Sequence, residues 1–171
     1  MKIVLIGYMG SGKSTIGELL SKILNINFID LDEYIESKLD CSVQEVFKEK
    51  GELFFRKMEH KYIQELMDEK KSFVLSTGGG TPCYSNNLDV IKTETPNVFY
   101  LKVSIAGLVE RLVLEKENRP LIANINNDGL PEFIGKHLFE RNNFYLKANH
   151  IITCDGKSPE KIVDEIKSRL T

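Results

Sequence analysis

Short apolar runs alternate along the chain with longer segments in which apolar residues recur every three to four positions. The short runs are rich in β-branched and aromatic residues and are bounded by turn residues, which is typical of buried strands. These runs predict strands at residues 2–6, 27–30, 72–76, 98–103 and 150–153. The helical spacing between them predicts helices at 14–24, 33–40, 42–50, 54–68, 85–93, 105–115, 131–147 and from 159 onward.

This alternation predicts an α/β fold in which a five-stranded parallel sheet lies between two layers of helices. A length of 171 residues suits one domain, and the chain contains no internal repeat or linker. We therefore expect a single domain over residues 1–171. Residues 116–130 depart from the pattern because they are mostly polar and too long for an idle connection; a disordered surface loop is the alternative.

A glycine-rich motif lies where the first predicted strand meets the first predicted helix. Residues 7–14 match G-x4-G-K-[ST] at every fixed position, and the strand–turn–helix context supports a P-loop NTPase fold. Glycines let backbone N–H groups converge on phosphate oxygens, and the helix directs its positive end at the same place. We expect Lys13 to reach the β- and γ-phosphates of ATP and Ser14 to bind Mg²⁺. The rest of the predicted ATP-binding loop is Gly10, Ser11, Gly12 and Thr15.

Two acidic residues, Asp30 and Asp32, follow the second predicted strand. Strand alternation would point both carboxylates to the same side, near the phosphate loop. One could then hold magnesium-bound water while the other faces an acceptor hydroxyl. The alternative is a pair of acids that cap the helix predicted from Glu33. Because the chain has no N-K-x-D motif, a GTPase is not favoured.

Composition narrows the possible partners and the compartment. A net charge of −2 provides no field that would attract nucleic acid or an anionic membrane. No apolar run approaches the roughly 18 residues of a membrane span. The three cysteines are widely spaced without a CxxC motif, which indicates reduced thiols. We expect a cytoplasmic monomer that binds small molecules, and neither nucleic acid nor a membrane.

Six short motifs, taken in this order, resemble the shikimate kinase family over essentially the whole chain. They are Gly-x-Met-Gly-Ser-Gly-Lys-Ser (7–14), Asp-x-Asp (30–32), Gly-Glu-x-x-Phe-Arg-x-x-Glu (51–59), Ser-Thr-Gly-Gly-Gly (76–80), Arg-Pro-Leu (119–121) and Glu-Arg-Asn-x-x-Tyr (140–145). The first is shared by many families, whereas the ordered set is far more specific. The resemblance implies ATP-dependent phosphorylation of shikimate to shikimate 3-phosphate, on the route through chorismate to aromatic amino acids, with Mg²⁺ as cofactor.

The resemblance also implies a role for each charged residue around the acceptor. Asp32 would bind ring hydroxyls of shikimate and is the candidate base. Arg56 and Arg141 would hold the substrate carboxylate, since guanidinium groups give a bidentate geometry that lysine cannot copy. Glu59, one helical turn after Arg56, could orient that guanidinium. The substrate-binding segment would span about 31–62, and the substrate would lie against three glycines: Gly78, Gly79 and Gly80.

On the nucleotide side, the resemblance implies that Asp30 and Ser76 support magnesium through water. Arg119 would belong to a mobile lid, about 115–130, that closes over the transferring phosphate and excludes water. With Lys13 and Asp32, it completes the implied catalytic set. The remaining implied contacts with ATP are Arg111, Lys157 and Pro159.

The chain departs from the family pattern in two places. Thr81 follows the triple glycine where a smaller residue is common, which predicts a slightly different pocket wall. Lys157 stands in a loop that carries an arginine in the family. Two other functions stay open on the sequence alone: a gluconate or nucleotide kinase of the same architecture, and a nucleotide-binding switch without catalysis.

Overall fold

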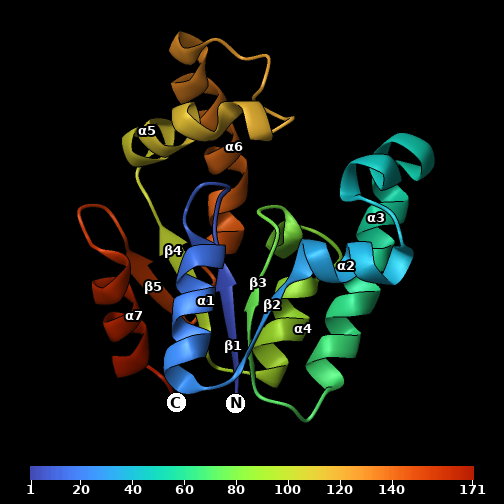
Figure 1. Cartoon of the computed structure of the whole chain (residues 1–171), viewed down its shortest axis with the longest axis vertical. Helices are drawn as coiled ribbons and strands as arrows, with labels where there is room; N and C mark the ends of the chain where they lie inside the picture. The colour runs from blue at the N-terminus through green and yellow to red at the C-terminus, as the bar shows by residue number, and fades with distance from the viewer.

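The computed structural model describes residues 1–171, except for the side chain of Asn118. A parallel sheet forms the centre of the molecule, with strand order β2-β3-β1-β4-β5 (Figure 1). The strands are β1 (Lys2–Ile6), β2 (Asn27–Asp30), β3 (Phe73–Ser76), β4 (Val98–Lys102) and β5 (His150–Thr153). The predicted five-stranded α/β fold is confirmed.

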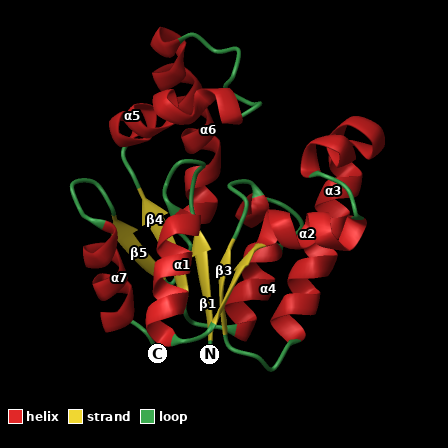
Figure 2. Ribbon diagram, in the orientation of Figure 1, coloured by secondary structure: helices red, strands yellow, loops and turns green.

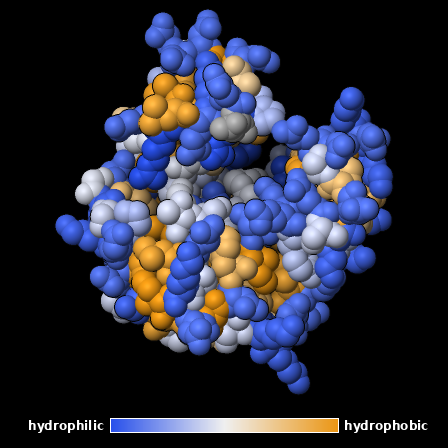
Figure 3. Space-filling view, viewed as in Figure 1, coloured by the Kyte–Doolittle hydropathy of each residue, from blue (hydrophilic) through white to orange (hydrophobic). Residues whose placement is uncertain are grey.

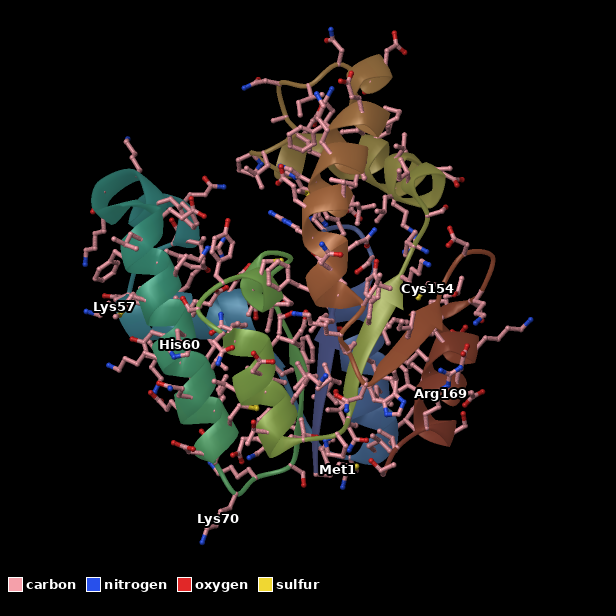
Figure 4. The ribbon with its side chains drawn as sticks, turned by 180° about the vertical axis from the view of Figure 1, so that it is seen from behind. Met1, Lys57, His60, Lys70, Cys154 and Arg169 are labelled. Atoms are coloured by element: carbon pink, nitrogen blue, oxygen red, sulfur yellow. The ribbon has the colours of Figure 1, made fainter. Side chains whose placement is uncertain are left out.

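Helices cover both faces of this sheet. They are α1 (Lys13–Leu24), α2 (Leu31–Leu39), α3 (Val43–Asp68), α4 (Asn87–Glu94), α5 (Ile105–Glu115), α6 (Leu130–Tyr145) and α7 (Pro159–Ser168). Figure 2 shows α1 and α7 in front of the sheet, and the view from behind in Figure 4 shows α3, α4 and α6 on the other side. Among the described residues, no helix is both long enough and apolar enough to cross a bilayer.

The core is built from the strands and the apolar faces of the helices that cover them. In β1, residues 3–6 have no exposed surface, as expected for a strand covered on both sides. Ile16 and Leu20 of α1, and Ile162 and Ile166 of α7, are buried in the same cluster. This packing places the phosphate loop at the carboxyl end of β1, the central strand.

The helices predicted at 42–50 and 54–68 are two parts of α3, separated by a kink at Gly51. Gly51 has φ 82° and ψ 168°, a conformation that favours glycine. The helix begins with a capping box, in which the Ser42 side chain accepts from the Glu45 N–H and the Glu45 carboxylate accepts from the Ser42 N–H. The predicted boundary between the two helices is therefore a kink within α3.

Residues 116–130 contain more structure than their polar composition predicts. Two 3₁₀ turns, Lys116–Asn118 and Asn127–Gly129, shape the segment. Ile122 and Leu130 are completely buried. Both side chains belong to the apolar core, and the segment joins α5 to α6 above the carboxyl ends of the strands (Figure 2).

Candidate active site

A cavity of about 530 Å³ opens at the carboxyl end of the sheet. Open α/β sheets bind ligands at this edge, where neighbouring connections run in opposite directions. Figure 3 shows the hollow between the upper part of the molecule and the lobe formed by α2 and α3. All ten predicted ATP-binding residues line it: residues 10–15, Arg111, Arg119, Lys157 and Pro159.

The phosphate loop has the backbone conformation that its glycines allow. Gly10 has φ 78° and Gly12 has φ 93°, and Gly12 is the N-cap of α1. The Lys13 ammonium group donates to the carbonyl oxygens of Gly7 at 2.9 Å and Tyr8 at 3.0 Å. The lysine thus braces the loop from inside and lies in the cavity wall.

Lys13 lies within a group of opposed charges. Burial lowers its pKa to about 8, and the Asp32 and Asp30 carboxylates oppose this shift. Arg119 and Arg141 lower the pKa further by repulsion. Both acids, the loop lysine and two arginines therefore act on one small volume.

The predicted magnesium ligands meet beside the loop. Ser14 Oγ donates to Asp30 Oδ2 at 3.1 Å and lies 3.5 Å from Ser76 Oγ. Asp30 and Ser76 are neighbours because they occupy the same register position in β2 and β3. Hydroxyl and carboxylate oxygens are ligands suited to Mg²⁺, which also retains water and binds phosphate oxygens. The residues present fit that ion.

Asp30 and Asp32 lie together, but the argument from strand alternation is wrong. β2 ends at Asp30 and α2 begins at Leu31, so Asp32 is helical. Asp30 is the N-cap of α2, and its Oδ1 accepts from the Asp32 N–H at 3.1 Å. The helix start therefore places both side chains in the cavity wall.

The Asp32 carboxyl has an unusually high proton affinity. Burial raises its pKa to about 6, and the negative charges of Asp30 and Glu59 add to the shift. The positive charge of Lys13 opposes it. Asp32 is therefore ionised at neutral pH and readily accepts a proton.

The three glycines at 78–80 each face a different charged side chain. A Cβ on the first would lie 3.3 Å from Asp32 Oδ1, and one on the second would lie 3.4 Å from Arg141 Nη1. A Cβ on the third would lie 2.8 Å from Arg56 Nη2. Side chains from α2, α3 and α6 therefore converge on one backbone segment.

Arg56 is held by its own helix and by an aromatic ring. Its Nη1 donates to Glu59 Oε2 at 3.1 Å, which is the expected contact, and its Nε donates to Glu52 at 3.4 Å. The Tyr84 ring lies 4.0 Å from Arg56 Cζ. Tyr84 was not predicted, because no spacing in the sequence relates it to Arg56.

Arg141 stands on a helix that is joined to both sides of the cavity. Arg141 and Tyr145 lie one helical turn apart on α6, and the Tyr145 hydroxyl donates to the Gly79 carbonyl at 2.6 Å. The Tyr8 hydroxyl lies 3.0 Å from His137 Nδ1, also on α6. Tyr145 belongs to the sixth motif, yet the sequence assigned it no role.

The basic residues on the nucleotide side already have partners in the protein. Arg111 Nη1 donates to two carbonyl oxygens of the phosphate loop, each at 3.2 Å. Arg119 Nε donates to Glu115 at 2.8 Å, and Lys157 pairs with Glu165 at 2.5 Å. All three basic side chains nevertheless line the cavity.

The Thr81 side chain is completely buried, and its hydroxyl donates to Glu59 Oε1 at 2.6 Å. The turn after the glycines therefore directs this side chain toward α3. Thr81, like Arg56, Gly80 and Arg141, is not among the residues that line the cavity of the phosphate loop. The predicted change in the wall of the acceptor site stays a prediction.

Known proteins are similar to this chain over nearly its full length. A family model described as shikimate kinase matches residues 9–171. The shikimate kinase of Flavobacterium psychrophilum is 51% identical over 165 residues, covering 96% of each chain.

Solved structures give the same result. Shikimate kinase from Bacteroides thetaiotaomicron is 35% identical with a TM-score of 0.91, covering 98% of this chain and 97% of that one. Shikimate kinase from Acinetobacter baumannii, in complex with shikimate, is 28% identical with a TM-score of 0.85, covering 99% and 95%. With its phosphate loop, its acidic pair and its arginines gathered on the glycine segment, the chain belongs to the shikimate kinase family.

Proposed function

We propose that the protein transfers the γ-phosphoryl group of ATP to the 3-hydroxyl of shikimate, yielding ADP and shikimate 3-phosphate for aromatic biosynthesis. Family membership supports the reaction class. The observation that carries the proposal is the convergence of Asp32, Arg56 and Arg141 on residues 78–80, beside the cavity that contains the phosphate loop.

The acceptor binds between the glycine segment and the charged side chains around it. Arg56 and Arg141 supply two guanidinium groups for one carboxylate, and guanidinium forks match that planar anion. Without side chains at 78–80, the substrate ring can approach the backbone. The acceptor segment of about 31–62 then comprises α2 and α3 as far as Tyr62.

ATP binds with its phosphates on the loop that precedes α1. Ser11 Oγ is buried and has no hydrogen-bond partner among the described residues, so a phosphate oxygen would supply one. Ser14 would contact Mg²⁺ directly, and Asp30 and Ser76 would hold its water ligands. Bound Mg²⁺ supplies positive charge that offsets the charge on the β- and γ-phosphates.

Catalysis then depends mainly on position and charge. The transition state of phosphoryl transfer is loose, so the nucleophile needs orientation more than early deprotonation. Asp32 accepts the hydrogen bond of the attacking hydroxyl and takes its proton as the bond to phosphorus forms. Lys13 and Arg119 stabilise negative charge on the transferring group.

Residues 115–130 act as a lid over this reaction. Arg119 lines the cavity while its guanidinium is paired with Glu115, so it already stands near the phosphates. Closure of the segment would bring Arg119 onto the phosphoryl group and exclude water. Arg111, Lys157 and Pro159 then border the adenine side of the cavity.

We also propose that the enzyme is a cytoplasmic monomer. The cysteines at 41, 83 and 154 are free thiols, which suits a reducing compartment. Light scattering with the purified protein tests the monomer.

The test of function is ADP release from Mg·ATP with and without shikimate. In a panel of acceptors that includes gluconate and nucleoside monophosphates, only shikimate is expected to support turnover. Preference for another acceptor would identify a different kinase of this architecture. ATP binding without turnover on any acceptor would indicate a noncatalytic module. Removing Mg²⁺ with a chelator should abolish turnover.

The pH dependence of kcat/KM for shikimate is expected to show two limbs when ATP is held well below its KM, so that groups of the free enzyme are reported. Activity should fall as pH drops through about 6, because protonated Asp32 cannot accept the hydroxyl proton. It should also fall as pH rises through about 8, because Lys13 then loses its charge. A profile measured from about pH 5 to about pH 9 tests both limbs. A rate that stays constant down to about pH 5 would contradict the raised pKa of Asp32.

Replacing Gly80 with alanine should raise the KM for shikimate about tenfold. The new Cβ would lie 2.8 Å from Arg56 Nη2 and displace that guanidinium. Because Gly80 has φ −85°, alanine adds no backbone strain. Gly135→Ala is the matched control, since its Cβ would meet nothing nearer than 3.6 Å. Equal KM values in the two variants would show that the close approach does not matter.

A further inference from the structure

Thr81 is fixed in place by its backbone on both sides. It begins the 3₁₀ turn Thr81–Cys83 directly after the glycine segment. Its N–H donates to the Gly78 carbonyl at 3.1 Å, and its own carbonyl accepts from Asn87 Nδ2 at 3.0 Å. Threonine is stiff at χ1, so a fixed backbone leaves its hydroxyl few directions.

The same turn is tied to two helices. Asn87, at the start of α4, is completely buried. Its amide nitrogen faces Thr81, so its oxygen faces His60 Nδ1 at 2.7 Å and accepts a hydrogen bond from the Nδ1–H group. Figure 4 labels His60 on α3, beside α4. Residues of α3 and α4 thereby hold the backbone from which the Thr81 hydroxyl projects.

The Thr81 hydroxyl completes the hydrogen bonding of a buried carboxylate. Glu59 is 1% exposed, and its Oε1 accepts from Thr81 at 2.6 Å while its Oε2 accepts from Arg56 Nη1 at 3.1 Å. In the part of the chain that the structure describes, these are the side-chain donors that reach Glu59. An ionised carboxylate only accepts, so the two donors together fix its orientation.

We propose that Thr81 is a positioning residue for the acceptor site: its hydroxyl holds Glu59, and Glu59 holds the Arg56 guanidinium toward the substrate carboxylate. This inference rests on the proposed function. Without the hydroxyl, one buried carboxylate oxygen would lack a donor, and Glu59 would turn to find another, taking Arg56 with it. ATP contacts neither Glu59 nor Arg56 in the proposed arrangement. Loss of the Thr81 hydroxyl therefore weakens the binding of shikimate and leaves the binding of ATP unchanged.

Thr81→Val and Thr81→Ser test this role, because valine keeps the shape without the hydroxyl and serine keeps the hydroxyl. In Thr81→Val, the KM for shikimate is expected to rise about tenfold, while kcat and the KM for ATP change less than about twofold. In Thr81→Ser, all three constants should stay within about twofold of the original protein. A normal KM for shikimate in Thr81→Ser would show that Thr81 acts through its hydrogen bond and not through the packing of its methyl group.

Thr95→Val is the matched control. Thr95 is 3% exposed, and its hydroxyl donates to the Lys2 carbonyl at 2.7 Å, at the amino end of β1, whereas the cavity lies at the carboxyl ends of the strands. This variant should lose stability without a change in the KM for shikimate. If Thr81→Val behaves the same way, or raises the KM values of both substrates equally, the positioning role is wrong.

Two further results keep the test decisive. Should Thr81→Val not fold, Thr81→Ala replaces it, and an unchanged KM for shikimate in folded Thr81→Ala would overturn the role. The unmodified protein is assayed in parallel. If it releases no ADP with shikimate, the proposed function fails; if it is active and Thr81→Val matches it, only the role of Thr81 fails.

Discussion

Replacing Asp32 with asparagine is expected to lower kcat by about a hundredfold to ten-thousandfold, while ATP still binds. Asparagine has nearly the same shape, but it cannot take the proton of the acceptor hydroxyl and carries no charge. Asp32 faces residue 78 of the glycine segment and lines the same cavity as the phosphate loop. Its substitution therefore affects the acceptor hydroxyl and not the binding of ATP. Shikimate-dependent ADP release and calorimetric titration with an ATP analogue measure the two quantities.

The control for this variant is Asp40→Asn. Asp40 is the exposed C-cap of α2, with φ 51°, a left-handed conformation that asparagine tolerates. The same change of charge on the same helix should leave kcat unaffected. Near-normal turnover in Asp32→Asn would show that neither the proton-accepting carboxylate of Asp32 nor its charge is needed for the reaction.

Replacing Arg56 with lysine is expected to raise the KM for shikimate by about tenfold to a hundredfold, with the KM for ATP changed less than about twofold. A lysine ammonium group is a point charge. It cannot bind the substrate carboxylate in a bidentate way while it also contacts Glu59, and the guanidinium contact with the Tyr84 ring is lost. Steady-state kinetics with each substrate varied in turn would measure both constants.

Arg169→Lys serves as the comparison. Arg169 also pairs with a carboxylate, at 2.6 Å from Glu165, but it follows the end of α7, on the other side of the molecule from Lys57, the neighbour of Arg56 (Figure 4). Its replacement should change neither KM. If Arg56→Lys raised both KM values by the same factor, Arg56 would not be a specific ligand of the acceptor.

Features that depend on near neighbours in the chain could be predicted from the sequence. The phosphate loop requires glycines at particular φ values between a strand and a helix, and Gly10 and Gly12 adopt those values. The capping box of Ser42 and Glu45 joins residues three positions apart. The alternation of apolar runs and helical periods indicated a parallel sheet, because each element buries its apolar face against the next layer.

The acidic pair shows where such reasoning gave a correct placement for a wrong reason. Asp30 and Asp32 were expected to share a side through strand alternation, yet the strand ends between them. The start of a helix places both in the cavity wall instead. The boundary between strand and helix depends on packing against the sheet, and two residues of sequence do not reveal it.

Local patterns were enough to predict the order of strands and helices along the chain, the phosphate loop and the residues of the site. Three contacts at the site appear only in the folded chain. Arg56 and Arg141, from helices far apart in the chain, face neighbouring glycines of one segment; the Tyr84 ring packs against Arg56; and Thr81 turns inward to Glu59. Caps and periodicity act within about four residues, whereas these contacts arise because whole elements pack around the sheet.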